Sequence, residues 1–198
     1  AEDFIKKLFE QFAPSCVFCG EDYRYGKNAS GDITSLKKAC DECGVELIVC
    51  PFVKISGEKI STSNVKRALE RGDVKLASEF LGEDYFICGT VETGRKEGRT
   101  IGFPTANISL PPEKFKLKEG VYKTYAYING KRYCGITNCG KAPTFGFEKL
   151  KIETYFKDFS GDIYGENLRI NFVDFLREDK KFASVEELKA QLKKDLQA

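Results

Sequence analysis

The 198-residue sequence contains no histidine, no methionine and no tryptophan. The absence of His removes the most common general base, so any acid–base catalysis would depend on a carboxylate, Lys, Tyr or Cys. The absence of Met even at position 1 predicts a cut or processed N-terminus. No apolar run is long enough to span a membrane, and the first residues do not resemble a signal peptide. We therefore expect a soluble cytoplasmic protein.

The sequence also lacks an excess of charge of either sign. Its 32 Lys and Arg and 30 Asp and Glu residues give a net charge of +2. A balanced charge provides no general attraction to nucleic acid or to a membrane surface, so we expect small-molecule partners. The composition does not indicate an oligomeric state. The length allows one large domain or two small ones, each with a usable core.

The eight cysteines include two Cys-x-x-Cys pairs, Cys16 with Cys19 and Cys40 with Cys43. This spacing is typical of zinc sites. The first pair, however, lies in an apolar run that reads as a buried strand, where residues three apart point to opposite faces. The second pair ends a helical stretch rather than a tight turn. We favour buried reduced thiols and keep a structural zinc or redox module as the alternative.

The first 84 residues alternate between helical and strand-like patterns. The predicted segments are a helix over 2–12, a strand over 15–19, a helix over 33–43, a strand over 46–53, a helical pattern after residue 61 and a short helix over 73–81. Gly72 and Gly82 are helix stops. The strand–helix–strand order predicts parallel strands, as in α/β domains.

After Gly82, short alternating segments take over. Strands are predicted over 85–91, 120–128, 131–139, 151–159 and 168–176. Asn129-Gly130 is a two-residue hairpin signal, and five or six antiparallel strands at this spacing predict a small closed barrel. A last helix over 184–196 begins with a capping box of Ser184 and Glu187. The predicted class is α/β plus β, with domains over 1–84 and 85–198.

The segment from Gly94 to Asn107 is the strongest chemical signal. Glycines at 94, 98 and 102 and the cations Arg95, Lys96 and Arg99 form a basic loop whose backbone N–H groups can point at an anion. Pro104 then fixes the backbone before Thr105 and Asn107, two neutral oxygen ligands suited to Mg²⁺. This pattern predicts a nucleotide site. A surface hairpin is the alternative, because glycine-rich basic loops are common.

Residues 98–107 resemble the phosphate- and magnesium-binding segment of riboflavin kinases, Gly-Arg-x-x-Gly-Phe-Pro-Thr-Ala-Asn. Further blocks match in family order: Gly120-Val121-Tyr122, Asn138-x-Gly140, Pro143-Thr144-Phe145, Ile152-Glu153-Thr154, Tyr164-Gly165, Leu176-Arg177 and Lys181-Phe182. The resemblance covers about residues 85–198. It implies a six-stranded antiparallel β-barrel with a C-terminal helix, ATP and riboflavin as substrates, and FMN as product.

The resemblance also implies roles for individual residues. Glu153 would accept the proton of the riboflavin 5′-hydroxyl, and Thr105 and Asn107 would hold Mg²⁺. The implied ATP-binding residues are Gly94, Gly98, Arg99, Gly102, Pro104, Phe156, Asp158 and Tyr164, and the implied flavin-binding residues are Arg177, Lys180 and Phe182. Taken alone, a Glu on a strand is most often solvated, and a non-catalytic flavin- or nucleotide-binding module is an alternative.

The front part resembles bacterial FMN adenylyltransferases. Residues 20–27, Gly-Glu-Asp-Tyr-Arg-Tyr-Gly-Lys, are similar to their Gly-x-Asp-Phe-Arg-Phe-Gly segment. Ser61, Thr62, Ser63 and Lys66 match a segment that contacts nucleotide phosphates in that family, with Lys66 in place of an Arg, which loses the bidentate fork.

The family's His-x-Gly-His motif would precede residue 1, and this chain has no His. The front half is therefore predicted to be the C-terminal part of a Rossmann-like nucleotidyltransferase domain. We expect a riboflavin kinase. The alternative is a fragment of a bifunctional FAD synthetase that also makes FAD from FMN and ATP.

Overall fold

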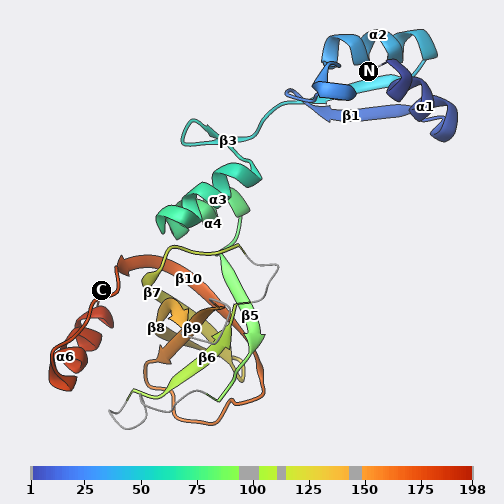
Figure 1. Cartoon of the computed structure of the whole chain (residues 1–198). Coiled ribbons are helices and arrows are strands. Elements are labelled where there is room, and N and C mark those ends of the chain that lie inside the picture. The colour runs from blue at the N-terminus through green and yellow to red at the C-terminus, as the bar shows by residue number, and fades with distance from the viewer. Residues whose placement is uncertain (1, 94–102, 111–114, 143–148, 198) are drawn as a thin grey trace. The chain divides into compact units, whose positions relative to one another are not determined.

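The computed structural model describes residues 2–93, 103–110, 115–142 and 149–197 (Figure 1). The chain divides into two compact units, residues 1–60 and 61–198. Packing therefore groups residues 61–84 with the barrel, whereas the sequence placed a domain boundary at residue 84. The domain boundary at residue 84 therefore stays a prediction, distinct from the division into compact units.

The first unit is a small α/β arrangement. It contains α1 (Glu2–Phe12), β1 (Cys16–Gly20), a 3₁₀ turn (Lys27–Ala29), α2 (Ile33–Cys43), β2 (Glu46–Cys50), β3 (Lys54–Ile55) and β4 (Glu58–Lys59). β1 and β2 pair in parallel, from Cys16 opposite Glu46 to Gly20 opposite Cys50. The predicted strand–helix–strand unit is confirmed, although its second strand ends at Cys50 rather than at Val53.

The helix α2 begins at a capping box. Asp32 Oδ1 accepts a hydrogen bond from the Ser35 N–H at 2.9 Å, and Ser35 Oγ accepts one from the Asp32 N–H at 2.9 Å. These bonds satisfy backbone donors that a helix start leaves unpaired. Gly44 ends the helix with φ of 66°, a conformation that favours glycine.

The cysteines of the first unit are only partly buried. Cys19 and Cys40 lie in its core with Ile5, Tyr25 and Leu36, and burial raises the pKa of both thiols. Cys43 is exposed, so the prediction of buried thiols was wrong at this position. Among the residues that the structure describes, no three His, Cys, Asp or Glu side chains are grouped as a metal site would require.

The second unit starts with α3 (Thr62–Arg71) and α4 (Val74–Leu81), which pack on the barrel. Leu69, Val74 and Ala77 belong to the same buried cluster as Tyr122 and Phe172. The Lys118 N–H donates a hydrogen bond to the Leu69 carbonyl oxygen at 3.1 Å. These two helices are therefore part of the barrel unit. None of the described helices is long and apolar enough to cross a membrane.

Six strands form the barrel: β5 (Phe86–Thr90), β6 (Thr105–Ser109), β7 (Gly120–Ile128), β8 (Lys131–Ala142), β9 (Lys149–Phe156) and β10 (Asn167–Arg177). Their order is β5-β10-β7-β8-β9-β6, and each ladder is antiparallel (Figure 1). The two ends of this sheet approach each other, because the Glu92 N–H donates to the Asn107 carbonyl at 2.8 Å. A Cβ on Gly89 would lie 2.4 Å from Ile108 Cγ2, so only glycine permits this approach. The predicted six-stranded antiparallel barrel is confirmed.

The barrel interior contains a hydrogen-bonded row of threonines, and one of its turns is the hairpin that the sequence predicts. The hydroxyls of Thr124, Thr137 and Thr154 form a buried chain, with oxygen separations of 2.9 and 2.8 Å. Asn129 and Gly130 have φ of 50° and 75° between the paired Ile128 and Lys131, as in the predicted hairpin. β9 ends at Phe156, three residues earlier than predicted.

The last helix, α6 (Val185–Asp195), begins where the sequence predicts. Ser184 Oγ accepts a hydrogen bond from the Glu187 N–H at 3.2 Å. The Glu187 carboxylate accepts its bond from the Ala183 N–H at 3.0 Å rather than from Ser184. The cap is therefore confirmed, and its return bond reaches one residue further back.

Candidate functional site

Three polar side chains form a row across three neighbouring strands. Glu153 on β9 lies opposite Asn107 on β6 and opposite Asn138 on β8. Its neighbours Ile152 and Thr154 are buried in the barrel interior, so Glu153 lies on the outer face. We call Asn107, Glu153 and Asn138 the Asn–Glu–Asn row. The order of the sheet brings these three residues together, although they are far apart in the sequence.

In both amides of the row, the side-chain oxygen lacks a hydrogen-bond partner within the described part of the chain. Asn107 is 4% exposed, and its Nδ2 donates to the Thr105 carbonyl oxygen at 3.3 Å. Its Oδ1 is buried and finds no hydrogen-bond partner within the described part of the chain, and the same holds for Asn138 Oδ1. Leaving a buried acceptor unsatisfied is costly, and such groups in a native fold call for an explanation. Two such oxygens beside one carboxylate indicate a ligand site.

Glu153 has a cation next to it on the same strand. Lys151 Nζ lies 2.6 Å from Glu153 Oε1, and both side chains are partly exposed. Residues two apart on a strand share a face, which explains the pair. A partly exposed carboxylate within reach of solvent and of both amides can accept a proton from a bound hydroxyl.

A pocket of about 220 Å³ lies where β6 begins and β9 ends, a few residues along these strands from Asn107 and Glu153. No member of the row lines it. Its lining residues are Val91, Pro104, Thr105, Ala106, Phe156, Phe159, Ser160, Gly161, Asp162, Ile163 and Tyr164. Four predicted site residues, Pro104, Thr105, Phe156 and Tyr164, are thus brought into one cavity with aromatic and aliphatic walls. We call it the aromatic pocket. It has the character of a site for a flat ring joined to polar groups.

The other residues assigned to ATP are placed differently. Asp158 is exposed, lies in a turn with φ of 57° and does not line the aromatic pocket. Gly94, Gly98, Arg99 and Gly102 lie outside the described residues. Their phosphate-binding role stays a prediction.

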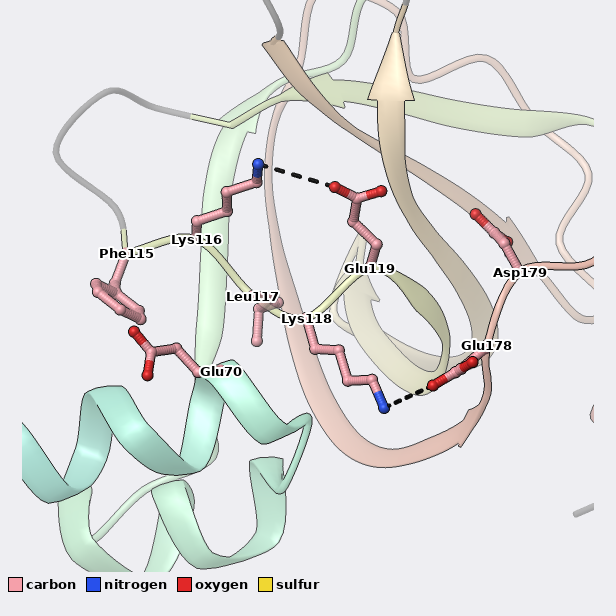
Figure 2. A pocket seen from close by; sticks show the side chains of 8 residues that line it. All are labelled: Glu70, Phe115, Lys116, Leu117, Lys118, Glu119, Glu178 and Asp179. Atoms are coloured by element: carbon pink, nitrogen blue, oxygen red, sulfur yellow. Dashed lines mark ion pairs between the residues drawn. The ribbon is translucent and has the colours of Figure 1, made fainter.

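A second, more open pocket of about 560 Å³ lies on the same unit (Figure 2). It is lined by Glu70, Phe115, Lys116, Leu117, Lys118, Glu119, Glu178 and Asp179. Figure 2 shows its two ion pairs, Lys116 with Glu119 at 3.8 Å and Lys118 with Glu178 at 3.0 Å. We call it the carboxylate pocket.

Asp179 connects the carboxylate pocket to the Asn–Glu–Asn row. Burial raises the pKa of Asp179; the Arg177 guanidinium opposes this shift, and the nearby Glu119 and Glu153 carboxylates add to it. A Cβ built on Gly140 of β8 would lie 3.4 Å from Asp179 Oδ2 and 3.8 Å from Asn138 Oδ1. Asp179 and Asn138 therefore border the same space.

The predicted flavin residues are engaged with the C-terminal segment. Arg177 Nη2 lies 2.8 Å from Oδ2 of the buried Asp195, and its Nη1 donates to the Glu178 carbonyl at 3.1 Å. The centre of the Phe182 ring is 5.7 Å from the Arg177 guanidinium and 4.9 Å from Lys180 Nζ. Arg177 therefore ties the end of β10 to α6. A flavin contact by these residues stays a prediction.

The predicted adenylyltransferase residues lie together at the start of α3. Ser61 caps this helix, with its Oγ accepting from the Asn64 N–H at 3.2 Å. Thr62, Ser63 and Lys66 lie on its first turns, and Lys66 Nζ is 5.4 Å from the centre of the Phe115 ring. A helix start with hydroxyl and ammonium groups is suited to phosphate, and this role also stays a prediction.

Sequence reasoning assigned no role to Asn138, Phe159, Ile163 or Asp179. Asn138 stood within a quoted block, Asn138-x-Gly140, but only the strand register places it beside Glu153. Asp179 follows the last strand in a charged run, where one acid cannot be singled out by pattern.

Two models of known protein families match this chain. A riboflavin kinase model matches residues 81–198, and a FAD synthetase model matches residues 1–64. The bifunctional riboflavin kinase/FMN adenylyltransferase of Listeria monocytogenes is 41% identical over 182 residues, covering 91% of this chain and 58% of the relative. The corresponding protein of Bacillus subtilis is 38% identical, covering 90% of this chain and 57% of the relative.

A solved structure from Streptococcus pneumoniae, described as a macrolide-efflux protein, is also similar. It is 33% identical, with a TM-score of 0.86, and the match covers 100% of this chain and 64% of that one. The chain thus spans less than two thirds of the length of these relatives.

Proposed function

Because the chain belongs to the riboflavin kinase family, we propose that it transfers the γ-phosphoryl group of ATP to the 5′-hydroxyl of riboflavin, giving FMN and ADP. The observation that carries the proposal is the Asn–Glu–Asn row, which shares the strands β6 and β9 with the aromatic pocket. A binding-only module would have no need of a partly exposed carboxylate between two unsatisfied amide oxygens. Phosphoryl transfer needs alignment, charge neutralisation and a proton acceptor.

Glu153 supplies the proton acceptor. It takes the proton of the 5′-hydroxyl as the oxygen attacks phosphorus, and the bond from phosphorus to the leaving ADP oxygen breaks. Lys151, 2.6 Å away, holds the carboxylate on the outer face.

Thr105 and Asn107 fit a magnesium site. The buried, unsatisfied Asn107 Oδ1 and the Thr105 hydroxyl are hard oxygen donors of the kind that Mg²⁺ accepts alongside water and phosphate. Bound there, Mg²⁺ would neutralise charge on the transferred phosphoryl group. Thr105 also lines the aromatic pocket, so the same strand end serves the nucleotide and its metal.

FMN adenylyltransferase activity is the second candidate. The FAD synthetase match over residues 1–64 and the hydroxyl-rich start of α3 favour it. The chain has no His, so a paired-His grip on the α-phosphate is not available from its own residues. We therefore propose the kinase as the activity of this chain, and the adenylyltransferase as an activity of longer bifunctional proteins.

The test is incubation of the purified chain with ATP, Mg²⁺ and riboflavin, followed by chromatographic separation of riboflavin, FMN and FAD. We expect ATP-dependent FMN. Failure to form FMN, with the barrel shown to be folded by circular dichroism, would contradict the proposal.

A further inference from the structure

The side-chain oxygen of Asn138 is a buried polar atom that the proposed chemistry does not use. This atom, Oδ1, has no hydrogen-bond partner in the described part of the chain, although the residue lies in a regular ladder. An amide oxygen can only accept a hydrogen bond. The group that satisfies it must therefore be a hydrogen-bond donor or a cation, and the bare phosphate oxygens of ATP are neither.

The position of Asn138 indicates which bound molecule can supply that hydrogen-bond donor. Directly opposite side chains in an antiparallel pair have Cβ atoms about 4.5–5.5 Å apart. Asn138 is opposite Glu153, so a small group that delivers one hydroxyl to Glu153 brings its adjacent hydroxyl within reach of Asn138. The nucleotide side of the row lies on the other flank of Glu153, at Asn107 and Thr105.

A second acceptor lies next to Asn138. The built Cβ position at Gly140 is 3.4 Å from Asp179 Oδ2 and 3.8 Å from Asn138 Oδ1, which places both acceptors around one small space. Gly140 keeps that space open, because a larger residue would fill it. Asp179 also lines the carboxylate pocket, which offers the apolar side chains of Phe115 and Leu117 further out.

We propose that Asn138 and Asp179 bind the hydroxyl next to the reacting one, and that the site therefore selects acceptors carrying a vicinal diol at the phosphorylated end. This inference rests on the proposed kinase function and adds a specificity determinant to it. The reacting hydroxyl gives its proton to Glu153. The neighbouring hydroxyl donates to Asn138 Oδ1, in the space that Asp179 also borders, and so orients the acceptor for attack.

The experiment compares two acceptors, riboflavin and 4′-deoxyriboflavin, which lacks only the hydroxyl next to the 5′-position. For the unmodified protein we expect kcat/KM to be about tenfold or more lower with the deoxy compound, since a buried acceptor is then left unpaired. Asn138→Ala should lose a similar factor with riboflavin and should turn over both acceptors alike. Asn167→Ala, an exposed change at the start of β10, is the matched control and should keep the full discrimination.

The outcomes separate the two proposals. Absence of FMN from the unmodified protein would overturn the kinase function and this inference with it. FMN formation with equal use of both acceptors, or a tenfold preference that persists in Asn138→Ala, would overturn the inference alone. If Asn138→Ala does not fold, Asp179→Ala provides the same comparison: reduced discrimination is expected, and unchanged discrimination would contradict the proposal.

Discussion

At the scale of single residues, Glu153 lies opposite an amide on each neighbouring strand, Asn107 on β6 and Asn138 on β8. The amides of Asn107 and Asn138 do not ionise near neutral pH, so within the row only Glu153 can act as a base. The amides instead provide oriented oxygens. In the proposed reaction, the Asn107 flank serves the metal and the nucleotide, and the Asn138 flank serves the acceptor.

Glu153→Gln is expected to lower turnover by about 10²–10⁴-fold, the range that general-base catalysis provides, with little change in KM. The amide keeps the size of the carboxylate but cannot take the proton. Steady-state kinetics with riboflavin measures this. Glu166→Gln, an exposed change before β10, is the control. A Glu153→Gln protein with more than half of the original turnover would contradict the assignment.

Thr105→Val combined with Asn107→Ala is expected to raise the Mg²⁺ concentration needed for half-maximal activity by about tenfold or more, because two oxygen ligands are lost. A magnesium titration at fixed ATP measures this. Since Asn107 is buried, the folded state is checked by thermal unfolding in parallel. Identical magnesium curves for the variant and the unmodified protein would make these two residues structural.

At the scale of elements, the site depends on the register of β6, β9 and β8. A shift of one residue in β9 would turn Glu153 into the interior and bring Ile152 or Thr154 out. The buried hydroxyl chain from Thr124 through Thr137 to Thr154 opposes such a shift, because its members would lose their partners. The inner polar chain thus keeps the outer functional row aligned.

Asp32 at the start of α2 gives an element-scale prediction in the first unit. Bonds from the Ser35 N–H and hydroxyl lower the pKa of Asp32 below its ordinary value of 3.8. A lowered folded-state pKa adds stability that is present above the ordinary value and is lost as the pH falls through the folded pKa.

Asp32→Ala should therefore speed amide hydrogen exchange in α2 by roughly 2–10-fold at pH 5, and by less as the pH falls below about 4. Asp41→Ala on the same helix keeps the cap and is the control. A pH-independent difference between Asp32→Ala and the unmodified protein would show that the charge of the cap does not contribute.

Elements with a local signal could be predicted from the sequence. The Asn129-Gly130 hairpin, the strand–helix–strand unit and the Ser184 cap each depend on neighbouring residues, and all three are confirmed. The strand β6 was not identified as such, because burial does not alternate cleanly along it: Asn107 is buried although it lies on the outer face. The packing of α3 and α4 on the barrel was missed, since an apolar helix face does not reveal which surface it covers.

The family resemblance named Pro104, Thr105, Phe156 and Tyr164, and the structure groups these four residues in the aromatic pocket, while their role in binding ATP stays a prediction. Asn138 and Asp179 could not be identified from the sequence, because their significance comes from cross-strand register and from the chain returning over Gly140. Both depend on contacts between distant parts of the sequence. Neither leaves a local pattern to read.

At the scale of the whole molecule, this chain should make FMN but no FAD. Ser61 and Lys66 could hold the pyrophosphate side of ATP, but no His is present to hold the reacting α-phosphate. Without that grip, adenylyl transfer loses the alignment that supplies much of its rate. Chromatography after incubation with FMN, ATP and Mg²⁺ measures this, with the riboflavin reaction as the positive control. FAD formed by the purified chain would contradict the role assigned to the absent histidines.

The pairing of β5 with β10 also sets the order in which the barrel can form. During synthesis β5 is the first barrel strand to leave the ribosome, and its ladder partner β10 is the last. Joining them closes a long loop, which is entropically costly and slow. Until then β7, β8, β9 and β6 can pair only as an open sheet, with β7 as an unprotected edge that other chains can join. A pause in translation between β9 and β10 would therefore be the moment when a nascent chain is most prone to aggregate.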